Sequence, residues 1–433
     1  MKKPDIYQRR RSQLMQHMQR GIAVIPTAAE ALRNGDAHFP FRFDSHFHYL
    51  SGFDEPEAVL VLIAGDKPQS LLFCRDKDIE REIWDGFRYG PEQAAKLFGF
   101  DAAYSISLFD EKLVELMGNQ PALHLPLGAQ ANWDDRILAL RTRVQGQARS
   151  GITAPNEIHD VRMVLNEMRL IKDDAEKSVM RRASTISAGA HRRAMQATRP
   201  GKMEYEIEAE LLHEFRRHGA QAPAYTSIVA GGGNACVLHY IHNNMQLKDG
   251  DLLLIDAGCE LDGYASDITR TFPVNGKFSA AQKEVYEIVL AAQYAAIAAA
   301  RPGNHWNVPH DEAMRVLVQG MIDLKLCNGT VDSVIESGDY KRFYMHRTGH
   351  WLGMDVHDVG NYKINNEWRD LIPGMALTAE PGLYIRPADN VPEALWNIGI
   401  RIEDDVIITE SGCEVITHEA PKTVADIEYS MKS

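Results

Sequence analysis

The chain contains few cysteines, no long apolar run and no excess of basic residues. Its five cysteines are odd in number, and no short spacing pairs them: Cys74, Cys236, Cys259, Cys327 and Cys413. This usage is typical of reduced thiols, and it argues against a disulfide framework or a zinc–thiolate site.

The other two absences limit location and partners. No stretch approaches the roughly 18 to 20 apolar residues that a membrane-spanning helix requires. The polar N-terminal sequence, with three arginines at 9–11, lacks the hydrophobic segment of a signal peptide. We therefore expect a cytoplasmic protein without membrane contacts. The net charge of −13 argues against nucleic acid as a partner.

The length of 433 residues, with 45% hydrophobic content, allows two separate cores. Residues 1–170 are predicted to form an α/β domain, in which strand-like runs alternate with helical stretches. The expected strands are 21–25, 58–63 and 70–73, and the expected helices are 92–98 and 133–142. After a boundary near Leu170, longer helices are predicted at 173–193, 204–218 and 280–300.

Two aspartates mark the first segment that carries chemistry. A buried-strand run ends at Asp256, and a turn signal precedes Asp267. If Glu260 lies opposite Gly263, the antiparallel register places Asp256 directly opposite Asp267, with Cβ atoms roughly 4.5 to 5.5 Å apart. Two ionised carboxylates at this distance repel each other, so one takes a proton or a cation lies between them.

The same acidic pattern recurs more than a hundred residues later. A glycine, five residues, an acid and a second glycine occur at 250–258 and again at 374–382, where the acid is Glu380. A glycine followed by an acid four positions on occurs at 263–267 and at 399–403, where the acid is Glu403. The repeat predicts a duplicated cation site, although matches at so few positions also arise by coincidence.

Histidines lie between the two acidic repeats. His346 and His350 have the spacing of a helical zinc-peptidase pair, but no glutamate follows the first histidine, and Gly349 and Gly353 weaken a helix. We therefore predict a loop or a strand here. A lone histidine is more often structural than a ligand. An oxygen-rich site nevertheless lacks a nitrogen donor, and His350 is the best-placed candidate, with His357 seven residues further on.

Arg401 stands two positions before Glu403. On a strand, both side chains share one face, while the isoleucines at 398, 400 and 402 share the other and face the core. An arginine beside metal-binding carboxylates orients them through bidentate hydrogen bonds. The alternative is a surface ion pair, which contributes little stability.

Together these segments resemble the pita-bread metallopeptidases, and within them the Xaa-Pro aminopeptidase (aminopeptidase P) branch. The segments are 256–258, 267–272, 346–357, 378–382 and 399–404, and residues 41–53 are similar to the N-terminal domain of that branch. The resemblance implies an α/β domain over 1–170, which serves oligomerisation and substrate access. It also implies an α+β pita-bread catalytic domain over 171–433 with an internal pseudo-twofold duplication.

The resemblance also implies a dinuclear metal site with two divalent ions, most often Mn2+. Asp267 and Glu403 would bridge the ions, Asp256 would bind one of them, and His350 and Glu380 would bind the other. The donor chemistry agrees, since four carboxylates and one imidazole suit manganese better than a structural zinc. Four negative charges also balance two dications.

The implied reaction releases the N-terminal residue from short peptides with proline in the second position. A hydroxide activated by the two metal ions would attack the carbonyl, with Glu380 as the general base. His239, His346 and His357 would contact the substrate or stabilise the intermediate, and His346 would border the proline pocket. A bond to proline has no N–H, so its recognition requires a dedicated pocket.

Further residues match the family by position. Tyr225 and Tyr384 are similar to pocket residues, and Asp36 and Trp84 to residues of the pocket or of a subunit interface, with ordinary packing as the alternative. Arg347 departs from the family pattern, because a small residue often follows the first histidine. It would alter substrate access without touching the metals.

Other functions are compatible with parts of this pattern. An Xaa-Pro dipeptidase (prolidase) shares the ligand set, and it would cleave dipeptides only. A methionine aminopeptidase generally lacks such an N-terminal domain. Non-catalytic modules and metal-independent enzymes such as creatinase usually lose several ligands, and all five are present here. Family members are often dimers or tetramers, so we expect a homo-oligomer.

Overall fold

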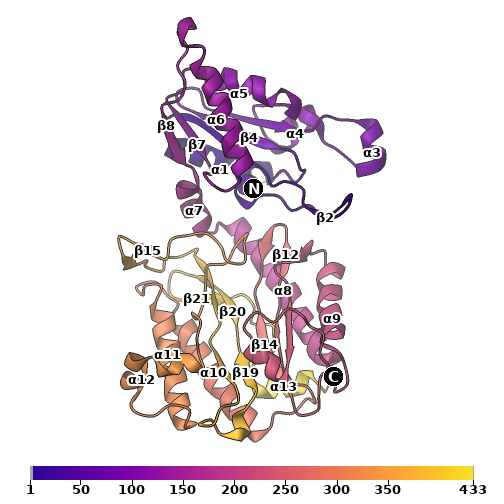
Figure 1. Cartoon of the computed structure of the whole chain (residues 1–433), viewed down its shortest axis with the longest axis vertical. Helices are drawn as coiled ribbons and strands as arrows, with labels where there is room; N and C mark the ends of the chain where they lie inside the picture. The colour runs from indigo at the N-terminus through magenta and orange to yellow at the C-terminus, as the bar shows by residue number, and fades with distance from the viewer. Residues whose placement is uncertain (1–2, 433) are drawn as a thin grey trace. The chain divides into compact units, whose positions relative to one another are not determined.

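The computed structural model describes residues 3–432, and the chain divides into two compact units (Figure 1). The units are Met1–Met168 and Arg169–Ser433. The break falls close to the boundary expected near Leu170. Among the helices described, none combines the length and the apolar character needed to cross a bilayer.

The N-terminal unit is built on a six-stranded mixed sheet with the order β6-β5-β4-β1-β7-β8. The strands are β1 (Gly21–Pro26), β4 (Val59–Ala64), β5 (Gln69–Cys74), β6 (Ala102–Ser105), β7 (Ala122–Leu125) and β8 (Glu157–Asp160). Strand β4 runs antiparallel to β1 and β5, and the remaining pairs are parallel. The three predicted strands are confirmed as β1, β4 and β5. A small hairpin, β2 (Leu32–Asn34) and β3 (Ala37–His38), lies outside the sheet.

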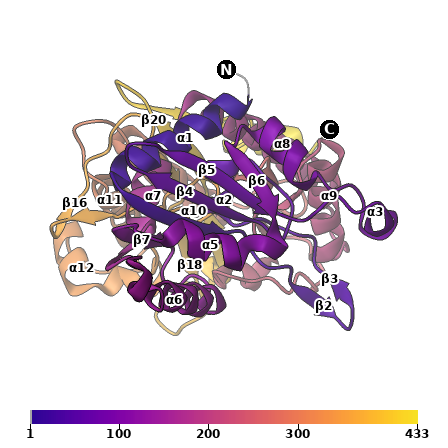
Figure 2. The ribbon, with the colours of Figure 1, turned by 90° about the horizontal axis from the view of Figure 1, so that it is seen from above.

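Helices cover the sheet, which explains why its strands read as continuous apolar runs. The helices of this unit are α1 (Lys3–Met18), α2 (Ser45–Ser51), α3 (Ile79–Asp85), α4 (Gly90–Phe98), α5 (Phe109–Met117), α6 (Ala131–Gln145) and, across its boundary, α7 (Arg162–Leu170). No residue of α3 is buried, so this helix does not cover the sheet. Alternate strand residues such as Val24, Val61 and Phe73 form a core with α5 and α6. Helices α1 and α2 pack on β4, and Figure 2 shows the strands lying between α1 and the α5–α6 pair. The predicted helices are confirmed as α4 and α6.

The C-terminal unit, Arg169–Ser433, corresponds to the domain that the resemblance implies is catalytic, and we call it the catalytic unit. It repeats one arrangement twice, which confirms the pseudo-twofold duplication. The first half contains α8 (Asp174–Ala197), α9 (Glu204–Arg217), β9 (Ala222–Pro223), β10 (Ile228–Gly231), β11 (Leu252–Asp256), β12 (Cys259–Leu261), β13 (Tyr264–Ala265) and β14 (Thr269–Pro273). The second contains α10 (Ala280–Ala299), α11 (Val308–Asp323), α12 (Val331–Ser337), β15 (Lys363–Ile364), β16 (Glu367–Trp368), β17 (Ala376–Ala379), β18 (Gly382–Ile385), β19 (Ile398–Arg401), β20 (Asp404–Ile408), β21 (Cys413–Val415) and α13 (Val424–Ser430). The expected helices are confirmed as α8, α9 and α10, and α11, α12 and α13 were missed. Figure 1 shows α8 and α9 on one side of the strands and α10 and α11 on the other.

The first hairpin corrects the predicted register by two residues. Leu261 pairs with Tyr264, and Asp256 pairs with Thr269, so Asp256 does not lie opposite Asp267 as expected. The turn consists of two residues, 262 and 263, both with positive φ (50° and 80°). The assumed turn also had two residues, 261 and 262, but a turn of this kind needs positive φ at both central positions, which Asp-Gly adopts more readily than Leu-Asp.

The second hairpin does bring its two acids opposite each other. Ala379 pairs with Asp404 and Gly382 pairs with Arg401. Glu380 and Glu403 lie between these pairs at matching positions. The acids of both hairpins therefore stand where one strand ends and the next begins, which leaves their side chains free to turn into a common space.

A buried ion pair links the two halves. Arg270 on β14 donates from Nη2 to Oδ1 of Asp404 on β20 over 2.7 Å, and both side chains are fully buried. Asp404 also accepts hydrogen bonds from Gln293, Thr417 and Lys422. Burial alone would raise the pKa of Asp404, but the charges of Arg270 and Lys422 lower it below its ordinary value. This carboxylate is therefore charged and fully paired.

Replacing Asp404 by alanine should destabilise the catalytic unit by about 3–5 kcal/mol, because it leaves the Arg270 guanidinium buried without its partner. The thermal transition of this unit should fall by roughly 10 °C, measured by calorimetry, which resolves units that unfold separately. Asp332→Ala is the matched control, since Asp332 pairs with Arg315 on the exposed surface and should change stability by less than about 1 kcal/mol. Equal effects of the two substitutions would contradict this account.

Candidate active site

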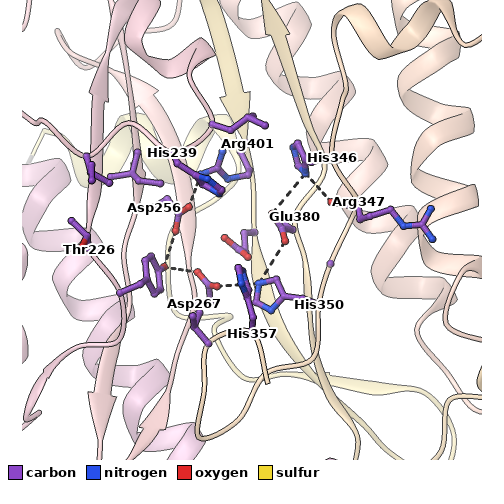
Figure 3. Close-up of a pocket in the computed structure, with 17 residues that line it drawn as sticks. Thr226, His239, Asp256, Asp267, His346, Arg347, His350, His357, Glu380 and Arg401 are labelled. Atoms are coloured by element: carbon purple, nitrogen blue, oxygen red, sulfur yellow. Dashed lines mark hydrogen bonds and ion pairs between the residues drawn. The ribbon is translucent and has the colours of Figure 1, made fainter. Parts of the chain in front are cut away.

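The catalytic unit contains a cavity of about 420 Å³ that collects side chains from both halves. All five expected metal ligands line it: Asp256, Asp267, His350, Glu380 and Glu403. The expected catalytic and substrate-binding residues Tyr225, His239, His346, His357 and Arg401 line it as well. Figure 3 labels all of these residues except Tyr225 and Glu403, and it shows the labelled side chains converging from separate strands and loops. Tyr384 is the exception, since it is fully buried behind the wall.

The donor atoms lie close enough to share a cation. One ligand atom each from Asp267, His350 and Glu403 fall within 4.8 Å of one another. His350 Nε2 is 3.3 Å from Asp267 Oδ2 and 3.7 Å from Glu380 Oε1. The hydroxyl of Tyr225 links Asp256 to the group. It donates to Asp256 Oδ1 over 2.7 Å and contacts Asp267 as well. Four carboxylates and one imidazole are the hard, oxygen-rich set that manganese and similar divalent ions prefer.

The local fold directs His350 into this cluster. Its Nδ1 donates to the carbonyl oxygen of Trp351 over 2.9 Å, which leaves Nε2 with its lone pair facing the carboxylates. A carbonyl on the far ring nitrogen is the usual support of a metal-binding histidine. Gly349 is required beside it, because a Cβ there would lie 2.2 Å from the carbonyl oxygen of Thr378. The segment is a loop, as predicted.

The electrostatics of the cluster favour bound cations. Burial raises the pKa of Asp267 and of Glu403, and the neighbouring carboxylates raise both further. Burial also raises the pKa of Glu380 to about 7, against the charges of His350 and Arg401. Burial opposes the charge on His350, yet Asp267 and Glu380 raise its pKa to about 9. Without a metal the cluster therefore takes up protons, and divalent ions supply the missing positive charge.

A layer of hydrogen bonds orients the carboxylates. Arg401 donates from Nη2 to Asp256 and from Nε to Thr269 Oγ1 over 3.1 Å. Thr269 in turn donates to Glu403 Oε2 over 2.6 Å. Arg401 is 4% exposed, so the surface ion pair considered above is excluded. Sequence reasoning missed Thr269, although its place two residues after Asp267 and opposite Asp256 follows once the register is known.

The three histidines of the wall differ in their environments. The Nδ1 of His346 donates to the carbonyl oxygen of Arg347 over 2.7 Å, and its Nε2 lies 2.8 Å from the Tyr384 hydroxyl. Burial lowers the pKa of His346 to about 3, so it is neutral. The His357 ring meets that of His350 edge-on at 4.3 Å, and burial lowers the pKa of His357 as well. His239 and His357 are both exposed to the cavity.

The loop that carries His357 is anchored by a carboxylate that sequence reasoning missed. Asp358 accepts from Lys172 Nζ over 2.9 Å and from Arg169 Nη2 over 2.6 Å, and all three side chains are buried. Gly353 makes room for it, since a Cβ there would lie 2.1 Å from Asp358 Oδ2. An isolated Asp after a histidine gives no sequence signal for such a buried cluster.

Asp36 and Trp84 lie outside this cavity, in the N-terminal unit. Asp36 is in the turn between β2 and β3, and Trp84 on α3 is 84% exposed. The expectation that they serve a pocket or a subunit interface stays a prediction.

The comparisons with known proteins agree with this geometry. Residues 178–410 match the model of metallopeptidase family M24, and residues 7–124 match that of the aminopeptidase P N-terminal domain. The chain is 46% identical to Xaa-Pro aminopeptidase of Escherichia coli, over 98% of this chain and 97% of that protein. It is 35% identical to human Xaa-Pro aminopeptidase 3, over 91% of this chain and 78% of that protein.

Solved structures give the same result for the fold. The structure of aminopeptidase PepP from Pseudomonas aeruginosa is similar with a TM-score of 0.98 and 50% identity, over 99% of this chain and 98% of that chain. E. coli aminopeptidase P with the inhibitor Pro-Leu is similar with a TM-score of 0.96 and 45% identity, over 99% and 98% of the two chains. The chain therefore belongs to metallopeptidase family M24. Within this family its activity is that of an Xaa-Pro aminopeptidase, as the sequence pattern predicted.

Metal removal should destabilise the protein more as the pH rises. Glu380 has an ordinary pKa of 4.5 and a folded pKa of about 7. A carboxyl whose folded pKa is raised binds protons more tightly in the folded state, so the metal-free fold loses stability as pH rises through that window. His350, with its pKa raised to about 9, shifts stability in the same direction.

The difference in thermal midpoint between manganese-loaded and chelator-treated protein should therefore widen from about pH 5 to about pH 8. In Glu403→Gln this difference should increase less with pH, because the substitution removes one of the repelling charges. Loaded and chelated profiles that run parallel over this range would contradict the interpretation of the cluster.

Proposed function

We propose that this Xaa-Pro aminopeptidase works with two divalent ions held between the halves of its catalytic unit. Asp267 and Glu403, one from each half, would share both ions. Asp256 would complete the first site, and His350 with Glu380 the second. The observation that carries the proposal is the cavity in which all five donors meet. Manganese is the ion that we expect from the donor set.

Bound divalent ions would supply two kinds of chemistry, a lowered pKa for water and polarisation of the scissile carbonyl. The chain supplies the proton transfer and the orientation. Glu380 faces the cavity beside His350 and is the carboxylate that we assign as general base. Arg401 keeps Asp256 in place, and with Thr269 it holds Glu403.

The walls of the cavity suit a proline ring next to the scissile bond. Ile228, Leu238, Ile241 and Val356 line it with apolar surface. His346 adds an aromatic edge whose single N–H is already used by a backbone carbonyl. This apolar surface matches the proline ring, which offers no N–H to an acceptor on the enzyme. We therefore assign His346 to the proline pocket, as the resemblance implied.

The two exposed histidines are the candidates for contacts with the reacting carbonyl. His357 and His239 both reach the cavity, and an imidazole offers at least one N–H donor in either protonation state. Such donors stabilise the negative charge that develops on the carbonyl oxygen. The Tyr225 hydroxyl contacts Asp256 and Asp267, and we expect it to meet the N-terminal end of the peptide. Tyr384 would act instead by holding His346 and Arg401.

Two related structures support a peptide with proline as the substrate class. One is E. coli aminopeptidase P in complex with substrate, and the other contains its inhibitor Pro-Leu. We transfer this class of ligand to the cavity described here. The homo-oligomer stays a prediction. The cytoplasmic location stays a prediction as well. All five cysteines are free thiols.

Peptide selectivity tests the proposed function against the dipeptidase alternative. With manganese, the enzyme should cleave Ala-Pro-Ala well, and Ala-Ala-Ala and Ala-Pro poorly, and chelator should abolish each activity. The reason is that the apolar wall accepts the proline ring, and the metal ions are required for the attack. Rapid cleavage of Ala-Pro with no cleavage of Ala-Pro-Ala would instead establish a prolidase.

Asp267→Ala should reduce turnover of Ala-Pro-Ala by at least about a thousandfold, because it removes a shared ligand of both ions. Its thermal midpoint in the presence of chelator should not fall, since one of the repelling carboxylates is gone. Turnover of the variant at the level of the wild type would refute the shared role of Asp267.

A further inference from the structure

Arg347 lies at the cavity, and neither the metal site nor the proposed chemistry uses it. It lines the cavity next to His346, and its side chain is exposed. Figure 3 shows the guanidinium turned away from the carboxylates, on the side opposite Thr226. The positive charge is therefore not part of the metal cluster, and it borders the space through which a longer peptide would pass.

Two contacts hold this exposed side chain in one place. Nη2 of Arg347 donates to Asn307 Oδ1 over 2.6 Å, and the guanidinium lies 5.1 Å from the ring centroid of Trp368. The Asn307 amide is itself oriented, because its Nδ2 donates to both carboxylate oxygens of Asp311 over 2.8 and 2.9 Å. A long side chain that is already ordered loses little entropy when it binds an anion.

The charge of Arg347 has no counter-ion. Over residues 3–432, no carboxylate lies within ion-pair distance of its guanidinium, and Asn307 takes only one of its five N–H donors. The four carboxylates of the cavity floor would be balanced by two divalent ions, which leaves Arg347 as an additional positive charge at the rim. The guanidinium fork matches a carboxylate in a bidentate manner.

We propose that Arg347 binds a carboxylate on the part of the peptide that follows proline. This inference rests on the proposed function, in which the neighbouring His346 borders the proline pocket. The carboxylate has two possible sources, the C-terminal carboxylate of a short substrate or an acidic side chain of a longer one. Arg347 is thus a specificity-determining residue, and it favours anionic peptides despite the overall net charge of −13. That overall charge is screened beyond about 10 Å.

The test is a set of matched peptides assayed with the manganese-loaded enzyme. Ala-Pro-Ala is compared with its C-terminal amide. In amidated peptides that begin with Ala-Pro, Asp is compared with Asn at the third, fourth and fifth positions, each step extending the reach by about 3.3–3.6 Å. The wild type should prefer the anionic member of at least one pair by about two- to fivefold in kcat/KM, mostly through KM.

Two variants locate this preference. Arg347→Gln should abolish it and Arg347→Lys should retain part of it, and added salt should weaken it in the wild type. The matched control is Lys363→Gln, because Lys363 lies 4.3 Å from the same Trp368 ring but does not line the cavity. This control should keep the preference.

The outcomes separate this inference from the proposed function. If the wild type cleaves the neutral amides but shows no preference at any position, or if Arg347→Gln keeps the preference, the role of Arg347 is refuted. An equal loss of the preference in Lys363→Gln would also refute it, because the preference would then depend on the overall charge of the protein and not on Arg347. Failure of the wild type to cleave any Ala-Pro peptide would instead refute the proposed function.

Discussion

Four carboxylates share one cavity, and their mutual repulsion is the constraint on which the catalytic unit depends. Asp256 and Asp267 come from the first half, and Glu380 and Glu403 from the second. Burial and like charge raise the pKa of three of them, and they force His350 to carry a proton when no metal is present. Bound divalent ions would offset this repulsion. The same ions would therefore both stabilise the site and supply its chemistry.

Each half of the duplication contributes two of these acids to the cavity. In each half the acids stand at the junctions between paired strands, next to the pairs β11–β14 and β17–β20. The buried pair of Arg270 and Asp404 then joins the halves directly behind the site. Around the ligands, Arg401 and Thr269 act as one hydrogen-bonded unit that reaches an acid of each half.

Much of this arrangement could be predicted from the sequence, because local patterns report it. The apolar runs identified β1, β4 and β5, and the acidic repeat with His350 pointed to the five candidate ligands that the structure brings together in one cavity. The register of the first hairpin was wrong, since it depends on the backbone of the turn at 262–263 rather than on the positions of the acids. Helix α11 was missed. The hydrogen bond from Arg347 to Asn307, the residue that precedes this helix, is therefore known only from the structure. Thr269 and Asp358 act through partners more than a hundred residues away in the sequence, which no local pattern reveals.

The central claim is that the five donors bind two ions rather than one or none. The most direct measurement is the number of manganese equivalents per chain, by metal analysis after equilibrium dialysis, for the wild type and for Asp256→Ala. The account predicts two equivalents for the wild type and one for the variant, in which only the site of His350 and Glu380 is complete. A wild-type chain that retains one ion or none at saturating manganese would contradict it.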